Sequence, residues 1–212
     1  MPDTRPGTYF EDGVCGACIN YDNRGKIDWT KREEELKQIC RHRIGQNEKY
    51  DCIAPVSGGK DSTFIVNKLV GLGMRPLLVT ITDEFTHTQA GAHNVKNIAE
   101  QFNLDHIIFR HAPGDFKGFT LNDFVGELHP LKWIEGKINE TPLMIAEALK
   151  IPLVFKGEYS PYEYGAVKDL ETHITTNNTT IYYMYAFFPY DELETLEVAR
   201  GLGFKEEREK VL

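Results

Sequence analysis

Four short apolar runs separated by helical patterns constrain the fold of this chain more than any other feature. Each run has the length and composition of a buried parallel strand, and they span 50–56, 76–82, 104–109 and 151–155. Between them, apolar residues recur at helical spacing over 61–72, 90–102 and 141–149. This alternation predicts an α/β fold with a doubly wound parallel sheet.

The segments on either side of this core have different compositions. Residues 1–30 are polar and rich in glycine, and 31–42 form a charged pattern typical of a surface helix. The segment 157–180 is rich in turn residues and aromatics, which predicts a long functional loop, and 191–204 again predicts an amphipathic helix. We therefore divide the chain into an N-terminal extension with a linker helix, 1–48, and a main domain, 49–212. The helix over 141–149 is expected to begin at Thr141, with Pro142 in its first turn.

Charge and hydropathy bear on the partners of the chain. Of its 212 residues, 24 are Lys or Arg and 32 are Asp or Glu, giving a net charge of −8, whereas proteins that bind nucleic acid usually carry a basic surplus or stripe. No apolar run approaches the roughly 20 residues of a membrane helix, and the N-terminus lacks the apolar core of a signal peptide. We therefore expect a cytoplasmic protein without nucleic-acid or membrane partners.

All four cysteines lie in the first quarter of the sequence, at Cys15, Cys18, Cys40 and Cys52. In a cytoplasmic protein, such a cluster favours metal binding or redox chemistry over a framework of disulfides.

The hexapeptide Ser57-Gly58-Gly59-Lys60-Asp61-Ser62 follows the first predicted strand and opens the first predicted helix. Glycines at such a position let backbone N–H groups approach a phosphate, and the helix N-terminus adds partial positive charge. The side chains of Ser57, Lys60 and Ser62 add hydroxyl and ammonium donors. The hexapeptide lacks the spacing of a Walker loop. It predicts an anion-binding loop, the alternative being a glycine turn that only permits tight packing.

The hexapeptide resembles the pyrophosphate loop (PP-loop) of the N-type ATP pyrophosphatases, which cleave ATP to AMP and pyrophosphate. This resemblance implies a Rossmann-like fold of the adenine nucleotide alpha hydrolase type, with ATP and Mg²⁺ as cofactors. It places the adenine near Thr82 and Asp83, at the end of the second predicted strand, and it implies that Asp61 helps to hold Mg²⁺. Asp83 could equally cap a helix, and Asp61 could be a carboxylate favoured by the helix dipole.

Further stretches of the chain resemble the N-acetyl sugar amidotransferase family. They are MPDTRPGTYFEDGVCGAC, KIDWTKREEELKQIC, YDCIAPVSGGKDSTF, IPLVFKGEYSPYEYGA and YYMYAFFPYDELETLEVARGLGF. The resemblance implies that an acetamido group of a bacterial sugar, such as one of the pseudaminic or legionaminic type or of an O-antigen, is adenylated. Ammonia from a separate glutaminase subunit then replaces its oxygen. Lys60, Asp61 and Glu158 are the catalytic candidates, with Glu158 contacting the substrate or metal, and His87 and His93 are weaker candidates.

This sequence departs from that family at its N-terminus, where the family carries a second Cys-x-x-Cys before the one represented here by Cys15 and Cys18. Four such thiolates would bind zinc, so Zn²⁺ at Cys15 and Cys18 is one interpretation, with Cys40 and His42 as replacement ligands, and two unliganded thiols are the other. The chain is also shorter than the family members. A tRNA thiolase and a non-catalytic ATP-binding homologue therefore remain alternatives, and the sequence leaves the oligomeric state open.

Overall fold

The computed structural model of the chain describes residues 8–85, 88–157, 159, 165, 172–176 and 178–206. Its centre is a six-stranded sheet with the order β5-β4-β3-β6-β8-β7. The strands are β3 (Cys52–Pro55), β4 (Pro76–Thr82), β5 (His106–Arg110), β6 (Leu153–Lys156), β7 (His173–Thr176) and β8 (Thr179–Tyr183). All neighbours pair in parallel except β7, which runs antiparallel to β8 at one edge. The predicted doubly wound sheet is confirmed.

The order of the parallel strands reverses between β3 and β6. From β3 the chain moves outward through β4 to β5, and then it returns to the other side of β3 to form β6 and β8. Open α/β sheets bind their ligands at such a switch point, outside the carboxyl ends of the strands. The topology therefore predicts a site where β3 and β6 end.

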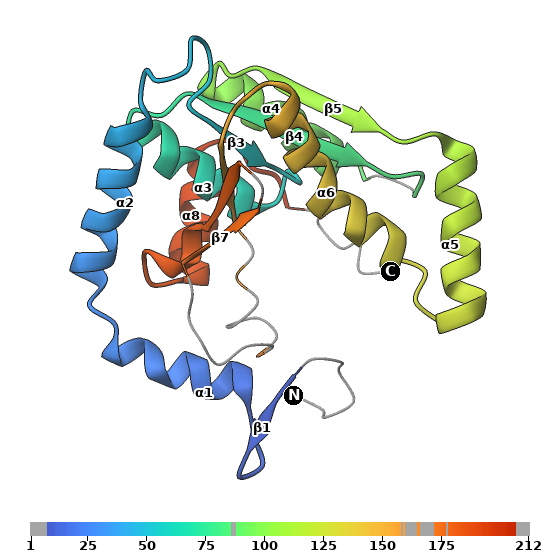
Figure 1. The fold of residues 1–212 in the computed structure, drawn as a ribbon, viewed down its shortest axis with the longest axis horizontal. Helices are drawn as coiled ribbons and strands as arrows, with labels where there is room; N and C mark the ends of the chain where they lie inside the picture. The colour runs from blue at the N-terminus through green and yellow to red at the C-terminus, as the bar shows by residue number, and fades with distance from the viewer. Residues whose placement is uncertain are drawn as a thin grey trace.

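Helices cover both faces of this sheet (Figure 1). One face packs against α3 (Lys60–Gly71), with α4 (Gln89–Phe102), α8 (Glu192–Gly201) and α2 (Trp29–Arg43) around it. The other face packs against α6 (Lys132–Ala148), beside which lies α5 (Pro113–Glu127). Side chains alternate along each strand, so that Cys52 and Ala54 face the α3 layer and Ile53 faces α6.

The helix predicted over 141–149 is longer than its sequence pattern suggested. It begins at Lys132, so Pro142 lies inside α6 rather than in its first turn. Proline has no N–H and so removes one helical hydrogen bond, which would normally end the helix. Here Ile134 before the proline and Ile145 after it are both buried, and their burial keeps the helix continuous.

The segment 157–180, predicted to be a loop, contains β7 and the start of β8. The prediction was wrong there because HITT and TTIYY are rich in polar threonines and lack the apolar run of a central strand. The β-branched residues nonetheless suit a strand at the sheet edge, and β7 is exposed along its whole length. The helix α5 was also missed, since its apolar residues show little helical periodicity.

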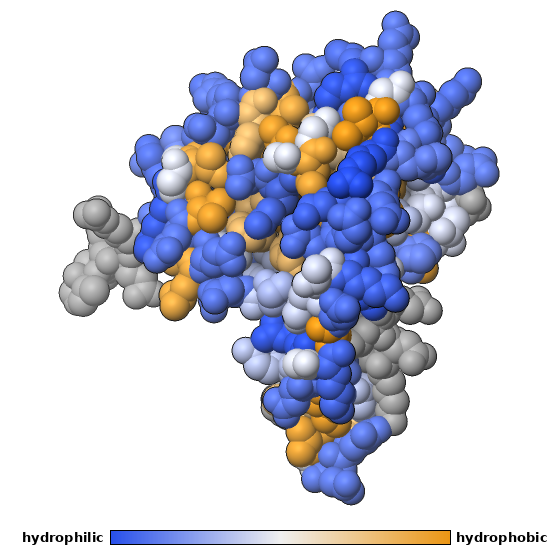
Figure 2. All heavy atoms as spheres, turned by 90° about the vertical axis from the view of Figure 1, so that its left-hand side faces the viewer, coloured by the Kyte–Doolittle hydropathy of each residue, from blue (hydrophilic) through white to orange (hydrophobic). Residues whose placement is uncertain are grey.

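The hairpin and first helix of the N-terminal part project from the rest of the molecule (Figures 1 and 2). A two-stranded hairpin, β1 (Phe10–Glu11) and β2 (Val14–Cys15), leads into α1 (Gly16–Asn23) and the 3₁₀ turn η1 (Arg24–Lys26). The second 3₁₀ turn, η2 (Met184–Ala186), follows β8. A search of the described residues finds no helix with the length and apolar character needed to cross a membrane.

Two glycines, Gly16 after the hairpin and Gly165, lie in close contact. The N–H of Tyr9 donates to the carbonyl of Gly165, at 3.3 Å, and a Cβ on Gly16 would lie 2.7 Å from that same oxygen. Gly165 has a φ of +62°, and a Cβ on it would overlap the backbone of Gly16 and Ala17. Main chain therefore packs directly on main chain, which only glycine allows at these two positions.

Candidate active site

The hexapeptide 57–62 connects β3 to α3 by a turn that depends on one glycine. Gly58 has a φ of +78°, a left-handed conformation that other residues rarely adopt. A Cβ at this position would lie 2.8 Å from both Cγ2 and the backbone nitrogen of Val95 in α4. Gly59 then caps α3 with an extended backbone. The turn thus brings the N-terminus of α3 directly to the end of β3.

Hydrogen bonds between the two serines fix the shape of this loop. The N–H of Ser57 donates to Oγ of Ser62 at 3.1 Å, and the two hydroxyl oxygens are 3.2 Å apart. The N–H of Gly59 donates to Oγ of Ser57 at 3.4 Å. Both serine hydroxyls therefore lie at the N-terminus of α3, where the helix dipole favours an anion.

Two tyrosines from the far end of the chain hold the charged pair of the loop. The hydroxyl of Tyr185 donates to Oδ1 of Asp61 at 2.8 Å, while the Lys60 ammonium contacts Oδ2 of Asp61 at 2.9 Å. The same ammonium donates to the Tyr190 hydroxyl at 3.1 Å and lies 3.7 Å from a carboxylate oxygen of Glu192. These contacts form a polar network around the start of α3.

The network changes the proton affinities of its members. Burial acts to lower the pKa of Lys60, but hydrogen bonds to Asp61 and Tyr190 outweigh burial and raise it, so the amine stays charged. Burial and the nearby Asp61 carboxylate raise the pKa of Tyr185, so its hydroxyl remains a donor. The loop therefore presents a permanent cation whose carboxylate partner is held in place.

A pocket of about 250 Å³ opens beside this loop. It is lined by residues at the ends of β3, β4 and β6 together with α3, α6 and η2, namely Pro55, Val56, Ser57, Asp61, Ser62, Ile65, Val79, Ile81, Ile138, Asn139, Lys156, Gly157 and Tyr185. The walls supplied by the strands are largely apolar, and the Lys156 ammonium donates to the Asn139 amide oxygen at 2.5 Å on the far side. The pocket lies at the switch point between β3 and β6, where the topology predicts a ligand.

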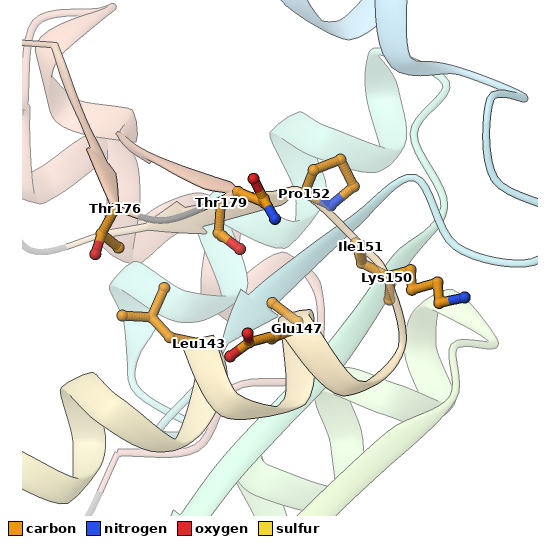
Figure 3. A pocket seen from close by; sticks show the side chains of 9 residues that line it. Leu143, Glu147, Lys150, Ile151, Pro152, Thr176 and Thr179 are labelled. Carbon is orange, nitrogen blue, oxygen red and sulfur yellow. The ribbon is translucent and has the colours of Figure 1, made fainter.

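A second pocket of about 250 Å³ lies at the opposite end of the sheet (Figure 3). Residues at the end of α6, before β6 and between β7 and β8 line it, including Leu143, Glu147, Lys150 and Thr179. It shares no residue with the loop and contains none of the predicted site residues. We therefore take the pocket beside the hexapeptide as the candidate active site.

Of the residues predicted from the sequence, Ser57, Asp61 and Ser62 line this pocket and Lys60 contacts Asp61. Thr82 is the last residue of β4 and Asp83 follows it, just beyond Ile81, which lines the pocket. The Asp83 carboxylate accepts the N–H of Phe85 at 2.8 Å and so stabilises a turn rather than capping a helix.

Three further candidates from the sequence are Glu158, His87 and His93. Glu158 and His87 fall outside the described residues. Nε2 of His93 lies 3.1 Å from the carbonyl of Gly203, and this contact joins α4 to the segment after α8. His93 therefore makes a structural contact on the α4 side of the fold.

The four cysteines separate into two environments. The sulfurs of Cys15 and Cys18 are 3.4 Å apart, whereas Cys40 and Cys52 are buried in the core on the α3 face. Across the residues that the structure describes, no three His, Cys, Asp or Glu side chains are grouped to hold a metal. The described part of the chain therefore does not bring Cys40 and His42 to the Cys15–Cys18 pair.

Sequence reasoning missed Tyr185, Tyr190, Asn139 and Lys156. The tyrosines belong to the aromatic run YYMYAFFPY, whose density of hydroxyl-bearing rings was the available signal. No signal marked Asn139 and Lys156, because they meet only when α6 packs beside β6.

Comparison of the sequence with known proteins finds one distant relative. No family model matches the chain. It is 20% identical over 162 residues to the uncharacterized protein MJ1599 of Methanocaldococcus jannaschii, a match that covers 76% of this chain and 57% of that protein. The chain thus spans little more than half the length of this curated relative.

Three solved structures resemble it over 84% of its length. They are the NH3-dependent NAD synthetase of Campylobacter jejuni (TM-score 0.54, 17% identity, 75% of that chain), the U34-tRNA thiolase NcsA of Methanococcus maripaludis with its [4Fe-4S] cluster (0.53, 15%, 67%) and the NMN synthetase of Francisella tularensis (0.53, 10%, 72%). At these identities the likeness concerns the fold. The chain shares with these three structures a Rossmann-like α/β fold built on a mostly parallel central sheet.

Proposed function

We propose that this chain is an ATP-dependent, AMP-forming amidotransferase whose substrate carries an acetamido group on a sugar. The observation that carries the proposal is the hexapeptide 57–62 at the switch point, which opens onto a pocket lined by Asp61, the carboxylate that Lys60 contacts. The resemblance of the hexapeptide to PP-loops and the fold shared with an NH3-dependent NAD synthetase support it.

The residues of the loop fit the phosphates of ATP. Gly58 keeps side-chain atoms out of the turn, the hydroxyls of Ser57 and Ser62 lie at the N-terminus of α3, and Lys60 supplies a cation. The Asp61 carboxylate, a hard oxygen donor, would hold Mg²⁺, which supplies further positive charge to the phosphates when bound. When ATP binds, the Lys60 ammonium would replace part of its hydrogen bonding to Asp61 by a hydrogen bond to a phosphate oxygen.

The apolar and polar walls of the pocket suit the rest of the reaction. Val79 and Ile81 offer an apolar surface to a flat base or a methyl group, and Asn139 and Lys156 offer an amide and a cation to a sugar.

In the reaction, the acetamido oxygen attacks the α-phosphorus and pyrophosphate leaves. Ammonia then attacks the activated carbon, AMP leaves with the oxygen, and an amidine remains. The chain contributes positioning and charge neutralisation.

The test is to incubate the purified chain with ATP, Mg²⁺, ammonium and acetamido sugars, including nonulosonic acids of the pseudaminic and legionaminic type. We expect AMP and pyrophosphate in equal amounts, together with a sugar in which NH replaces one oxygen. The Lys60→Ala variant serves as the matched inactive control. ADP as the nucleotide product would overturn the mechanism, and ATP binding without turnover on any acetamido sugar, with a glutaminase subunit supplied, would indicate a non-catalytic homologue.

A tRNA thiolase is the second candidate, because one structural neighbour is a U34-tRNA thiolase and because two thiols lie together at Cys15 and Cys18. The net charge of −8 argues against an RNA substrate. Filter binding with bulk tRNA at physiological salt separates the two candidates. Saturable, salt-sensitive binding at micromolar concentration would favour the thiolase.

A further inference from the structure

Cys15 and Cys18 form a pair of thiols at the start of α1, outside the candidate active site. Their sulfurs are 3.4 Å apart, and Cys15 is the residue that precedes the helix while Cys18 lies in its first turn. A disulfide needs sulfurs at about 2 Å, so a modest side-chain rotation separates this geometry from a bond.

The backbone on both sides of Cys15 is fixed by the hairpin. Cys15 is paired with Phe10 across β1 and β2, and the N–H of Gly16 donates to the carbonyl of Tyr9 at 2.8 Å. Gly16 also packs closely against the backbone of Gly165. Cys15 is therefore held in place, and Cys18 on the helix can turn toward it.

The two sulfurs differ in access to solvent. Cys15 is buried, with only 4% of its surface exposed, whereas Cys18 is exposed. A reagent in solution therefore meets Cys18 first. Hydrogen bonds from the backbone and side chain of Cys18 lower the pKa of Cys15, and the side-chain hydrogen bond to Cys15 raises the pKa of Cys18. The order of the two attacks is therefore assigned from access to solvent alone.

The other two cysteines provide an internal contrast. Cys40 and Cys52 lie in the core, at 1% and 0% exposure. Burial raises the pKa of Cys40 to about 12 and raises that of Cys52 well above its usual value. They have the environment of inert structural thiols.

We propose that Cys15 and Cys18 are a redox pair that exchanges reversibly with disulfides in solution, with Cys18 as the attacking thiol and Cys15 as the resolving thiol. The proposal concerns a modification site separate from the ATP pocket, and it holds whether or not the proposed amidotransfer is correct. Its chemical partner is a small disulfide of the glutathione class.

The exchange takes place in two steps. The Cys18 thiolate attacks one sulfur of the small disulfide, forming a mixed disulfide and expelling one thiolate. The Cys15 thiolate then attacks Sγ of Cys18, forming the Cys15–Cys18 disulfide and expelling the second thiolate. Two electrons pass from the pair to the small disulfide, and the two protons of the pair end on the two released thiols.

The experiment equilibrates the full chain with oxidised and reduced glutathione at a series of ratios, followed by alkylation and peptide mapping. We expect one Cys15–Cys18 disulfide that dithiothreitol reverses, while Cys40 and Cys52 remain alkylatable after unfolding. Four alkylatable thiols at every ratio would overturn the proposal. So would zinc that purifies with the chain and is lost in both single variants, because it would make the pair a metal site.

Single variants test the order of the steps. Cys15→Ser should accumulate glutathione on Cys18, and Cys18→Ser should react at least about tenfold more slowly, because its remaining thiol is buried. Faster modification of Cys18→Ser than of Cys15→Ser would overturn the assigned order. If either variant fails to fold, rapid acid quenching of the wild-type reaction provides the same information, since the transient mixed disulfide must be found on Cys18 and not on Cys15.

Discussion

The hydroxyl of Tyr185 donates a 2.8 Å hydrogen bond to Oδ1 of Asp61, a residue 124 positions earlier in the chain. The second oxygen of that carboxylate contacts Lys60. Tyr185 therefore restrains the carboxylate that contacts Lys60, and Tyr185 and Asp61 both line the same pocket. This relationship links the end of the sheet after β8 to the start of α3.

Replacing Tyr185 by Phe should weaken ATP binding by about 0.5–1.5 kcal/mol, the value of one hydrogen bond, because Asp61 is then less restrained. The ring is retained, so the core should lose little stability. Isothermal titration calorimetry with ATP and Mg²⁺ measures the change. Tyr182→Phe, on β8 outside the pocket lining, is the matched control. Equal ATP affinities for the two variants would contradict the role assigned to Tyr185.

Lys60→Ala removes the cation of the loop and should weaken ATP binding by roughly 1.5–3 kcal/mol, the range for a charge-assisted contact. Lys96→Ala provides the comparison, since Lys96 is an exposed residue of α4 that pairs with Glu100. The same calorimetric titration applies to both proteins. An unchanged affinity in Lys60→Ala would remove the loop from the ATP site.

Gly58→Ala should destabilise the chain by at least about 1–2 kcal/mol, because alanine pays this cost in a left-handed conformation even without a clash. The added Cβ would also lie 2.8 Å from Val95, so the loop must move and ATP affinity should fall as well. Gly118→Ala in α5 meets nothing within 4 Å and should stabilise its helix by about 0.5–1 kcal/mol. Urea unfolding of both variants checks the opposite signs, and a neutral Gly58→Ala would refute the argument.

His106 should make stability depend on pH. Burial lowers its pKa below the usual 6.5, so the folded ring stays neutral where the unfolded ring takes up a proton. Nε2 of His106 lies 2.8 Å from the Thr80 hydroxyl, which itself donates to the carbonyl of Val56 at 2.7 Å, so the ring carries its proton on Nε2. The unfolded state binds more protons below pH 6.5, and the free energy of unfolding should therefore fall as pH drops through that value.

The measurement is urea unfolding of wild type and His106→Gln at about pH 7.5 and about pH 5.5, on either side of the usual histidine pKa. The pKa of His111 is also lowered, chiefly by burial, so wild type and variant share that contribution and their difference isolates His106. The variant should lose less stability on acidification. A loss equal to that of the wild type would show that His106 does not titrate on unfolding.

The central strands and the loop were predictable from the sequence because each follows from local pattern. Strands β3 and β4 are apolar on both faces, and the hexapeptide follows β3 directly. Strand β7 and helix α5 were not predictable by the same reasoning. Strand β7 is an exposed edge strand that pairs with β8, and helix α5 has no clear apolar face and packs on α6, so neither element is marked by an apolar pattern of its own.

The residues of the candidate site also fall into two groups, those that the sequence could predict and those that only the fold brings to the pocket. Ser57, Lys60 and Asp61 lie within one short segment, so the sequence alone places their functional groups close together. Tyr185 and Asn139 reach the pocket from η2 and α6, so only the strand order β3-β6-β8 reveals their proximity to the loop. The acidic residue chosen from the family resemblance, Glu158, remains a prediction.

The contact between Gly16 and Gly165 has a consequence for how these two positions can change in evolution. A Cβ on Gly16 would meet the Tyr9 ring and, at 2.7 Å, the Gly165 carbonyl oxygen, and a Cβ on Gly165 would meet the backbone of Gly16 and Ala17, so a smaller neighbouring side chain would not make enough room at either position. A substitution at either position would release the hairpin that carries the Cys15–Cys18 pair. In related chains we therefore expect the two glycines and the two cysteines to be retained together or lost together.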